Sequence, residues 1–441
     1  MAGQCPTSYI IVGAGVFGAS TAYHLVNQHP EASVTLIDRS FPCQVAASWD
    51  WNKVARADYE DEFYMEMALE AMDSWTKDAL FSQYFRRTGV AWIIDDPEYH
   101  DRIIRNYQKF NRNEDCEAIN IDTLRKLYGG LFADLDSTGV VGKIFLNRDS
   151  GLVQAREVLQ AVIDEAERWG AKLVVAEVAR LIFDQNGDCA GVLTSNNETL
   201  SAGAVILCTG AYTEKLMADS APENPDLQLN GRLIASGVIC GLLQAEGEKL
   251  KIFKYGPVLV HNVGETQGIA APRLSYHQLT PSGEWMPPTA DGLIKFNRDL
   301  PWRNTQHHEA SGKNISAPPP APDYGQWSPS EGMKREVQMS AKGIFGSLID
   351  GLEWETYRQC WDAVAPDSNF LISPLPGCRR LYFATGGSFH GWKFLPMIGK
   401  YIVRMLDGEL GKEHRERWSW DRPLKGPKGH TYQPTREWKD L

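Results

Sequence analysis

Three glycines near the start of the chain have the spacing of a dinucleotide-binding turn. Gly13, Gly15 and Gly18 form the pattern G-x-G-x-x-G, and Asp38 follows twenty residues after the last of them. The first glycine permits a tight turn, the second leaves room for a pyrophosphate, and the third lets helix and strand pack closely. The helix that follows offers unpaired N–H groups to phosphate oxygens, and the acid can accept hydrogen bonds from a ribose. The pattern therefore predicts a bound dinucleotide.

The residues around this turn have the pattern of a βαβ unit. Residues 9–12 form a short apolar run typical of a buried parallel strand, and residues 33–38 form a second strand that ends in the acid. Between them, residues 19–27 carry apolar side chains at helical spacing, so we expect residues 13–18 to form the tight turn. This context favours a dinucleotide site over a glycine turn of some other α/β fold.

Two later segments repeat the order of strand and then glycine, and they bear on which dinucleotide is bound. They are residues 205–211, which include Gly210, and residues 381–387, which include Gly387. One ligand wrapped by three distant glycine turns suits a large, buried flavin. Asp38 disfavours the 2′-phosphate of NADP, although Arg39 weakens that argument. The sequence thus favours FAD, and an NAD-dependent dehydrogenase is the alternative.

The rest of the chain alternates helical and strand patterns. We predict helices over 61–78 and 156–169, the second ended by Gly170, and strands over 89–94, 172–176 and 204–208. Residues 228–300 alternate in short runs, which indicates a sheet-rich insert. We expect the stretch 304–332, which contains three consecutive prolines at 318–320, to be a surface loop, and the residues after Trp420 to be a surface-bound tail.

Composition limits the classes of function. The chain has 441 residues, with 45 Lys and Arg against 56 Asp and Glu and a net charge of −11, which argues against a nucleic-acid-binding surface. We find no apolar run that could span a bilayer and no secretory signal pattern, so we expect neither membrane insertion nor export. The eight cysteines are scattered without metal-binding spacing, so we expect no metal site and free thiols in a reducing compartment.

Seven motifs occur in a fixed order over nearly the whole chain: GAGVFG, LIDRS, SWDWNKV, VILCTGAYT, GLIKF, RQCWDAVAPDSNFLI and TGGSFHGWKFLPMIGKYIV. They resemble the monomeric sarcosine oxidase family of FAD amine oxidases, and are most similar to its fungal fructosyl amino acid oxidase (amadoriase) branch. The resemblance implies an α/β fold with a Rossmann-like FAD-binding domain and a sheet-rich α+β substrate domain, of the glutathione-reductase or D-amino-acid-oxidase type. It also implies oxidation of the secondary amine of an N-substituted amino acid to an imine, with release of H2O2.

The resemblance divides the chain into two domains. We expect a discontinuous FAD-binding domain of residues 1–90, 150–225 and 350–441, and a substrate domain of residues 91–149 and 226–349. The expected partners are a small amine substrate and O2, with no nucleic acid and no membrane, and we expect a monomer. The chain ends in Lys439-Asp440-Leu441, which departs from the peroxisomal tripeptide of several relatives. We therefore expect a cytoplasmic location, with peroxisomal import as the alternative.

The resemblance also gives roles to single residues. Cys360 stands where the family's flavin thioether forms, and a thiolate is a suitable nucleophile for a flavin methyl group. Lys295 stands where a lysine promotes reaction with O2 by stabilising negative charge. Lys393 stands where a lysine binds the substrate carboxylate, and a cation between Trp392 and Phe394 is costly unless it meets an anion. The alternatives are a buried structural cysteine and an ordinary surface lysine.

Further positions complete the predicted site. Arg56 falls near a second carboxylate-binding arginine of the family, and Lys53 lies in its N-K-V block, although either could face solvent or phosphate. His390 could shape the pocket near the flavin or be a core histidine. We assign catalytic roles to Lys295, Lys393 and Arg56. We expect FAD to be bound, covalently through the cysteine, by Gly13, Gly15, Gly18, Asp38, Arg39, Ser48, Lys53, Val178, Gly210, Cys360, Gly387, His390, Gly391 and Lys393.

The substrate and the electron acceptor have alternatives at this stage. Asp299 stands where amadoriases have a glutamate that contacts the sugar, so a fructosyl amino acid, an N-methyl amino acid, a cyclic imino acid and a secondary-metabolite precursor all fit. A flavin dehydrogenase with a protein acceptor is a competing class, against which Lys295 argues. A non-catalytic FAD-binding protein is another, against which the joint presence of Cys360 and both lysines argues.

Overall fold

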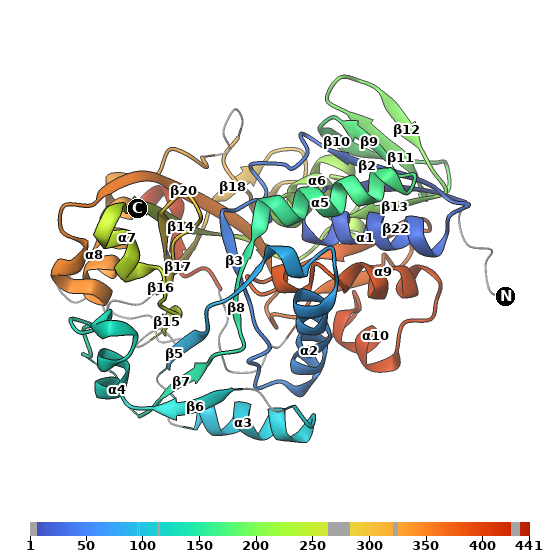
Figure 1. Cartoon of the computed structure of the whole chain (residues 1–441). Coiled ribbons are helices and arrows are strands. Elements are labelled where there is room, and N and C mark those ends of the chain that lie inside the picture. Colours follow the sequence, from blue (N-terminus) through green and yellow to red (C-terminus); the bar gives the residue numbers. More distant parts are fainter. Residues whose placement is uncertain are drawn as a thin grey trace.

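The computed structural model describes residues 7–94, 96, 98–112, 115–138, 140, 142–262, 283–320, 325–424 and 433–441. Among these residues, one sheet has six strands and another has nine. Figure 1 shows the first sheet at one end of the molecule, surrounded by α1, α5 and α9, and the second at the opposite end, near α7 and α8. The α/β fold with two sheet-based parts agrees with the fold class expected from the sequence.

The six-stranded sheet begins with the predicted βαβ unit. Its order is β21-β22-β13-β1-β2-β9, and every neighbouring pair is parallel except β21 with β22. Its strands are β1 (Ser8–Val12), β2 (Ser33–Asp38), β9 (Lys172–Val175), β13 (Ala204–Leu207), β21 (Leu371–Pro374) and β22 (Leu381–Thr385). The central strands β13 and β1 are short and mostly apolar because helices cover them. Helix α1 (Val16–Gln28) packs against α5 (Ala155–Arg168) and α9 (Ile398–Leu406).

The nine-stranded sheet has the order β20-β14-β17-β16-β15-β5-β7-β6, with β23 paired to β17. Its strands are β5 (Val90–Ile94), β6 (Cys116–Ile119), β7 (Ile144–Asn147), β14 (Ile234–Gln244), β15 (Val258–Asn262), β16 (Gly283–Met286), β17 (Leu293–Arg303), β20 (Glu353–Val364) and β23 (Arg436–Glu437). Strand β20 lies inside the segment 350–441 that we assign to the FAD-binding domain, yet it pairs with β14. The two-domain division of the chain stays a prediction.

Side chains of the nine-stranded sheet alternate between two apolar clusters. Trp92, Val260 and Met286 pack in the cluster that also holds α1 and α9, so their face of the sheet is turned toward the six-stranded sheet. Trp285 and Phe296 belong instead to the cluster formed with α8 (Glu331–Phe345). The period of two along each strand therefore decides which residues can reach a site between the two sheets.

The remaining elements are short sheets and helices. Two small sheets contain β3 (Asn52–Ala55), β4 (Phe85–Arg87) and β8 (Gly151–Gln154), and β10 (Val178–Phe183), β11 (Cys189–Thr194) and β12 (Thr199–Ser201). A hairpin pairs β18 (Thr305–His308) with β19 (Lys313–Ser316). The other helices are α2 (Glu62–Lys77), α3 (Tyr99–Lys109), α4 (Ile121–Lys126), α6 (Thr213–Ser220), α7 (Gly247–Phe253) and α10 (Lys412–Trp418). The predicted helices over 61–78 and 156–169 are confirmed as α2 and α5.

Two expectations about the chain are wrong. Helix α1 begins at Val16, so Gly18 lies within its first turn and not in the loop before it. The proline-rich stretch is only partly a surface loop, because Pro318 and Pro319 are buried and follow directly on the β18–β19 hairpin. A Cβ at Gly325 would lie 2.8 Å from the Pro319 ring, which shows how closely the chain folds back there. Of the predicted sheet-rich insert, 263–282 lies outside the described residues.

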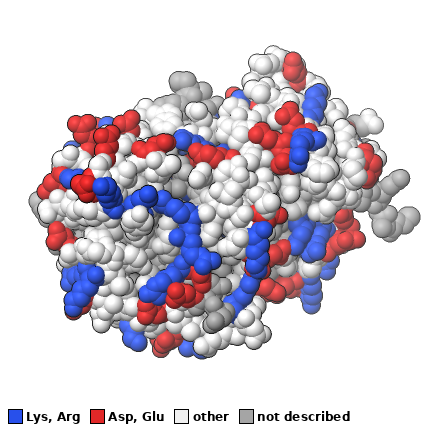
Figure 2. Space-filling view, in the orientation of Figure 1, with Lys and Arg blue, Asp and Glu red and all other residues white. Residues whose placement is uncertain are grey.

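The surface carries charges of both signs. Figure 2 shows Asp and Glu interspersed with Lys and Arg on the face drawn, and a run of Lys and Arg across the half that carries the nine-stranded sheet. The acidic surplus is therefore not gathered into one patch on this face. None of the helices in the described ranges is both long enough and apolar enough to cross a membrane.

Candidate active site

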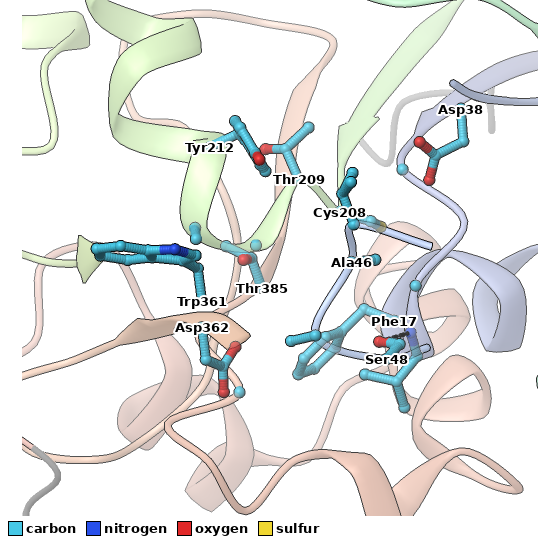
Figure 3. A pocket seen from close by; sticks show the side chains of 18 of the residues that line it. Phe17, Asp38, Ala46, Ser48, Cys208, Thr209, Tyr212, Trp361, Asp362 and Thr385 are labelled. Atoms are coloured by element: carbon cyan, nitrogen blue, oxygen red, sulfur yellow. Dashed lines mark hydrogen bonds between the residues drawn. The ribbon is translucent and has the colours of Figure 1, made fainter. Parts of the chain in front are cut away.

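A pocket opens at the carboxyl ends of the parallel strands of the six-stranded sheet. Its wall is formed by residues that follow β1, β2, β9, β13 and β22, and β20 closes it with Trp361 and Asp362. Figure 3 shows Asp38 at one end of this pocket and Trp361, Asp362 and Thr385 at the other, with Ser48 and Phe17 between them. Ligands of open parallel sheets bind at this edge, so the pocket has the expected place of a dinucleotide site.

Most of the predicted FAD-binding residues line this pocket. Those in its wall are Gly13, Gly15, Asp38, Arg39, Ser48, Lys53, Val178, Gly210, Cys360, Gly387 and Gly391. The wall does not include Gly18, His390 or Lys393. Gly18 lies behind the glycine turn, and His390 and Lys393 lie beside Gly391.

The glycine turn is constrained in the way its pattern predicts. Gly13 has a φ of +99°, and a Cβ there would lie 2.5 Å from the carbonyl oxygen of Cys208. A Cβ on Gly18 would lie 1.8 Å from the carbonyl oxygen of Gly13, so this glycine is required for close packing of α1 on the turn. Gly15 is the N-cap of α1 and lines the pocket, where a side chain would obstruct a ligand.

The start of α1 is arranged to hold an anion. The helix has neither an N-cap side-chain hydrogen bond nor an acidic residue in its first turn, so the positive end of its dipole faces the pocket. The N–H of Val16 donates to Ser48 Oγ over 2.8 Å, and the N–H of Ala14 donates to Asp38 Oδ2 over 2.7 Å. These bonds fix the turn and the acid at the place where the pyrophosphate and ribose of a dinucleotide would lie.

Polar atoms in the pocket wall also fit a ligand. Thr385 Oγ1 and Trp361 Nε1 are buried there and make no hydrogen bond to any residue in the described part of the chain. Leaving such groups unpaired costs about 1–3 kcal/mol each, so a bound molecule with polar edges would stabilise the protein. Together with the glycine turn, they show that the residues present fit FAD.

A buried cluster of charges lies beside the pocket and was missed by the sequence analysis. Asp50 Oδ2 is 2.6 Å from Lys295 Nζ, 2.9 Å from Lys53 Nζ and 3.9 Å from a terminal guanidinium nitrogen of Arg358. Three cations share one carboxylate, which leaves a surplus of two positive charges. Such a surplus favours a neighbouring cofactor in its more negative, reduced state. The signal for this cluster in the sequence is Asp50 in the motif SWDWNKV, three residues before Lys53.

The charges of this cluster stabilise one another. Burial alone would raise the pKa of Asp50, but Lys295, Lys53 and Arg358 hold it well below its usual range. Burial alone would lower the pKa of Lys53, but Asp50, and to a smaller extent Cys360, raise it. Lys295 is 1% exposed, and its ammonium also donates to the carbonyl of Asn52 over 3.2 Å. Its charge is therefore fixed in position within the protein interior.

Arg56 and Lys393 form a second cationic group, on the other side of Gly391 and Trp392. The Arg56 guanidinium lies 4.4 Å from the centre of the Trp92 ring and 4.9 Å from that of Tyr59, and Lys393 Nζ lies 5.2 Å from the Tyr59 ring. The backbone that carries the lysine is anchored, because Trp75 Nε1 donates to the carbonyl of Lys393 over 2.7 Å. Tyr59 thus separates two cations that the sequence places far apart.

Lys393 belongs to a hydrogen-bonded chain with a defined direction. Its ammonium donates to Tyr59 Oη over 2.9 Å and to the carbonyl of His390 over 2.7 Å. His390 Nε2 lies 2.8 Å from the carbonyl of Ser368, so this nitrogen carries the proton and Nδ1 accepts from Tyr59 Oη over 3.0 Å. Burial, followed by the charge of Lys393, lowers the pKa of His390 to about 3, so the ring is neutral.

The position of Lys393 is unfavourable for a cation without an anionic partner. The residue is 5% exposed, and burial, followed by the charge of Arg56, lowers its pKa well below the usual value. Two of its three N–H groups bond to Tyr59 and His390, which leaves one for a ligand. A carboxylate placed there would restore the charged form of the lysine.

We expect the affinity for simple carboxylates, such as acetate and propionate, to fall as pH rises. The carboxylate binds the ammonium form of Lys393, and because the pKa of this lysine is lowered, that form is lost at lower pH than for an ordinary lysine. Above that pKa, affinity should drop up to about tenfold per pH unit. Titrations of the FAD-loaded protein between pH 6 and 10, followed by flavin absorbance, measure this. The variant Lys393→Met should bind weakly without this slope, and a wild-type affinity independent of pH would contradict the role.

The structure thus brings the predicted residues together in three neighbouring groups. Cys360 and Lys53 lie in the pocket wall, Lys295 lies in the Asp50 cluster, and Arg56 and Lys393 meet at Tyr59. Asp299, which we considered as a substrate contact, is buried on the same strand as Lys295. The sequence analysis missed Asp50 and Arg358 in the first cluster and Tyr59 between the two cations of the second group.

Several known proteins resemble this chain over most of its length. The L-saccharopine oxidase of Schizosaccharomyces pombe is 25% identical over 435 residues, which cover 93% of this chain and 92% of that protein. The monomeric sarcosine oxidase of a Bacillus species is 22% identical over 407 residues, 90% of this chain and 92% of that protein. A fructosyl peptide oxidase from Aspergillus nidulans has the same fold, with a TM-score of 0.81 at 22% identity, over 99% of each chain.

These relatives confirm the resemblance that the ordered motifs indicate. The family model for FAD-dependent oxidoreductases of the DAO type matches residues 8–405, which contain the six-stranded sheet, every strand of the nine-stranded sheet except β23, and all three groups of site residues. FAD is therefore the dinucleotide for which the pocket is built, and the NAD-dependent alternative is excluded. The chain belongs to the DAO family of FAD-dependent oxidoreductases.

Proposed function

We propose that this protein oxidises the secondary amine of an N-substituted amino acid to an imine, with transfer of the electrons to O2. The observation that carries the proposal is the pair of cations Arg56 and Lys393 next to the FAD pocket, where burial, followed by the charge of Arg56, lowers the pKa of Lys393. An amino-acid carboxylate is the anion that such a pair would take. Relatives named for the oxidation of sarcosine and L-saccharopine support the substrate class.

The chain's own residues would bind and orient the substrate. Its carboxylate would accept the remaining N–H of Lys393 and the charge of Arg56, which fixes the distance of the amine from the pocket. Tyr59 and neutral His390 hold the lysine in one position. The aromatic rings of Tyr64, Phe370 and Phe394 pack around Tyr59 and His390. The rings exclude water from the carboxylate's surroundings and strengthen its attraction to the two cations.

The overall reaction balances with O2 as the only co-substrate. When bound, FAD supplies the acceptor for the electron pair that leaves with the hydrogen of a carbon next to nitrogen. The amine loses two electrons and two protons and becomes an imine, O2 gains them as H2O2, and water can then hydrolyse the imine. Lys295, held by Asp50 and the Asn52 carbonyl, would place a positive charge where negative charge develops on oxygen.

The substrate panel for the FAD-loaded protein tests this proposal. Sarcosine, a fructosyl amino acid, a cyclic imino acid and L-saccharopine are each offered with O2, and H2O2 and O2 uptake are measured. Equal amounts of H2O2 and consumed amine support the oxidase. Flavin that is bleached by an amine without air but not restored by O2 indicates a dehydrogenase with another acceptor. A flavin that no amine of the panel bleaches would overturn the proposed function.

We further propose that FAD is attached covalently through Cys360. This thiol lies in the pocket wall, is 8% exposed, and has the cation Lys53 in the same wall. The thiolate is the nucleophilic form of a cysteine, and a thioether to a flavin methyl group would form with loss of one hydrogen from the thiol and one from the methyl group, whose two electrons would pass to O2 to give H2O2. After acid precipitation, we expect yellow flavin in the wild-type pellet and free flavin in the supernatant of Cys360→Ala. Cys378→Ala, which changes a buried thiol that does not line the pocket, is the matched control. Flavin released from the wild type would rule out the covalent bond.

A further inference from the structure

A row of side chains crosses the nine-stranded sheet on the face turned toward the FAD-binding part. The register pairs Trp92 with Val260, Val260 with Glu284, and Glu284 with Asn297, so these four residues lie side by side on β5, β15, β16 and β17. Their face is fixed by Trp92 and Val260, which pack in the apolar cluster shared with α1. Glu284 therefore points toward the space between the two sheets and not toward α8.

Two residues of this row, Glu284 and Asn297, are partly exposed. Both residues are half-buried, although Trp285 and Met286 beside Glu284, and Phe296 and Arg298 beside Asn297, are all buried. Strand β16 lies inside the sheet, between β15 and β17, so sheet edges do not account for this exposure. Side chains in the middle of a sheet are accessible only where the opposing layer leaves room.

The carboxylate of Glu284 has a neutral partner. Asn297 Nδ2 donates to Glu284 Oε2 over 2.8 Å, which fixes the direction of the acid. Within the described ranges, no Lys or Arg forms an ion pair with it. Its charge nevertheless raises the pKa of Lys393, as does that of Asp58, in opposition to burial and to Arg56.

The register of this row also gives the length of a molecule that could extend from Arg56 to Glu284. Arg56 lies over the ring of Trp92, and Trp92 is two strands away from Glu284, a distance of about 10 Å at about 4.8 Å per strand. In an amino acid, a single carbon joins the carboxylate to the amine nitrogen. The amine of a substrate bound at Arg56 and Lys393 therefore does not need to reach Glu284. A substrate held at Arg56 and Lys393 would meet Glu284 with a group further along its chain.

We propose that Glu284 binds a second, positively charged group of the substrate, so that the preferred substrate is an N-substituted amino acid with a cation at its far end. This inference rests on the proposed amine oxidase and adds its substrate class. A buried or half-buried carboxylate without a cationic partner is costly, and a substrate ammonium or guanidinium would supply that partner. Glu284 would then select among substrates, whereas the two cations would bind the carboxylate that all of them share.

A charge series on one carbon skeleton tests the inference. The ligands are Nα-methyl-L-lysine, Nα-methyl-L-norleucine, which lacks the ammonium, and Nα-methyl-L-2-aminoadipate, which has a carboxylate instead. Dissociation constants come from perturbation of the flavin absorbance of the FAD-loaded protein, and kcat/KM from H2O2. The wild type should bind the lysine derivative at least about tenfold more tightly than the norleucine derivative. Glu284→Gln should reduce that ratio to about one, and Glu284→Lys should shift the preference to the dicarboxylate.

The control is Glu353→Gln, the same chemical change at an exposed position on β20 of the same sheet, which should leave the ratio as in the wild type. Equal affinities of the wild type for all three ligands, a ratio that Glu284→Gln does not alter, or failure of all three to bind would each overturn the role of Glu284. The amine-oxidase proposal is judged separately by the substrate panel, since oxidation of uncharged amines would uphold it while this series fails.

Discussion

Replacing Lys295 by methionine should slow reoxidation of the reduced protein by O2 about a hundred- to a thousandfold, the size of effect seen when one group that stabilises developing charge is removed. The lysine is 1% exposed and held between Asp50 and the carbonyl of Asn52, so water cannot replace its charge. Stopped-flow mixing of the substrate-reduced protein with oxygenated buffer measures the step. Reduction by substrate without air should change far less, because the cations proposed to bind the substrate carboxylate, Arg56 and Lys393, lie in a different group.

Two further variants define what this result means. Lys295→Arg keeps the charge and should retain much of the oxygen reaction, whereas Lys53→Met removes a different cation from the same carboxylate. If Lys53→Met slowed the oxygen step as much as Lys295→Met, the net charge of the cluster would matter and not the position of one ammonium. An oxygen step as fast in Lys295→Met as in the wild type would show that the assignment is wrong.

Replacing Asp50 by asparagine should lower the free energy of unfolding by about 3–5 kcal/mol, because it leaves two buried cations, Lys295 and Arg358, and the half-buried Lys53 without their shared carboxylate. Urea unfolding of the FAD-loaded protein at pH 7 measures the loss. Glu248→Gln is the matched control, since its ion pair with Lys251 is largely exposed and should change stability by less than about 1 kcal/mol. The double variant Asp50→Asn/Lys295→Met should be less destabilised than the sum of its single changes. Equal stability of Asp50→Asn and the wild type would contradict this account.

The same cluster gives stability a defined dependence on pH. The pKa of Asp50 is lowered in the folded protein by Lys295, Lys53 and Arg358, and the unfolded value is about 3.9. A lowered pKa contributes stability above the unfolded value, and that contribution is lost as the pH falls below about 4 toward the folded value. The wild type should therefore lose more stability than Asp50→Asn when the pH is taken from 5 to 3. The measured quantity is the change in the free energy of unfolding with pH, which should be larger for the wild type than for Asp50→Asn.

The sequence by itself determined the cofactor site and the cofactor. Gly13, Gly15 and Gly18 lie within one turn, and their spacing indicates a backbone geometry that a few neighbouring residues determine. Strands such as β1 and β2, and helices such as α2, were predictable for the same reason, since their patterns have periods of a few residues. The family resemblance added the positions of Lys295, Lys393 and Cys360, but it did not say what surrounds them.

Only the tertiary structure decided which charges meet. Asp50 and Lys295 are 245 positions apart along the chain and bond only because β17 lies beside the loop before β3. Glu284 reaches the space near Lys393 through the register of β15, β16 and β17. Strand register and the packing of one sheet on another are set by the whole core, and a shift of one residue would turn each of these side chains to the opposite face. The candidate site residues could thus be named from the sequence, whereas their partners, and with them the net charge of each group, are a product of the fold.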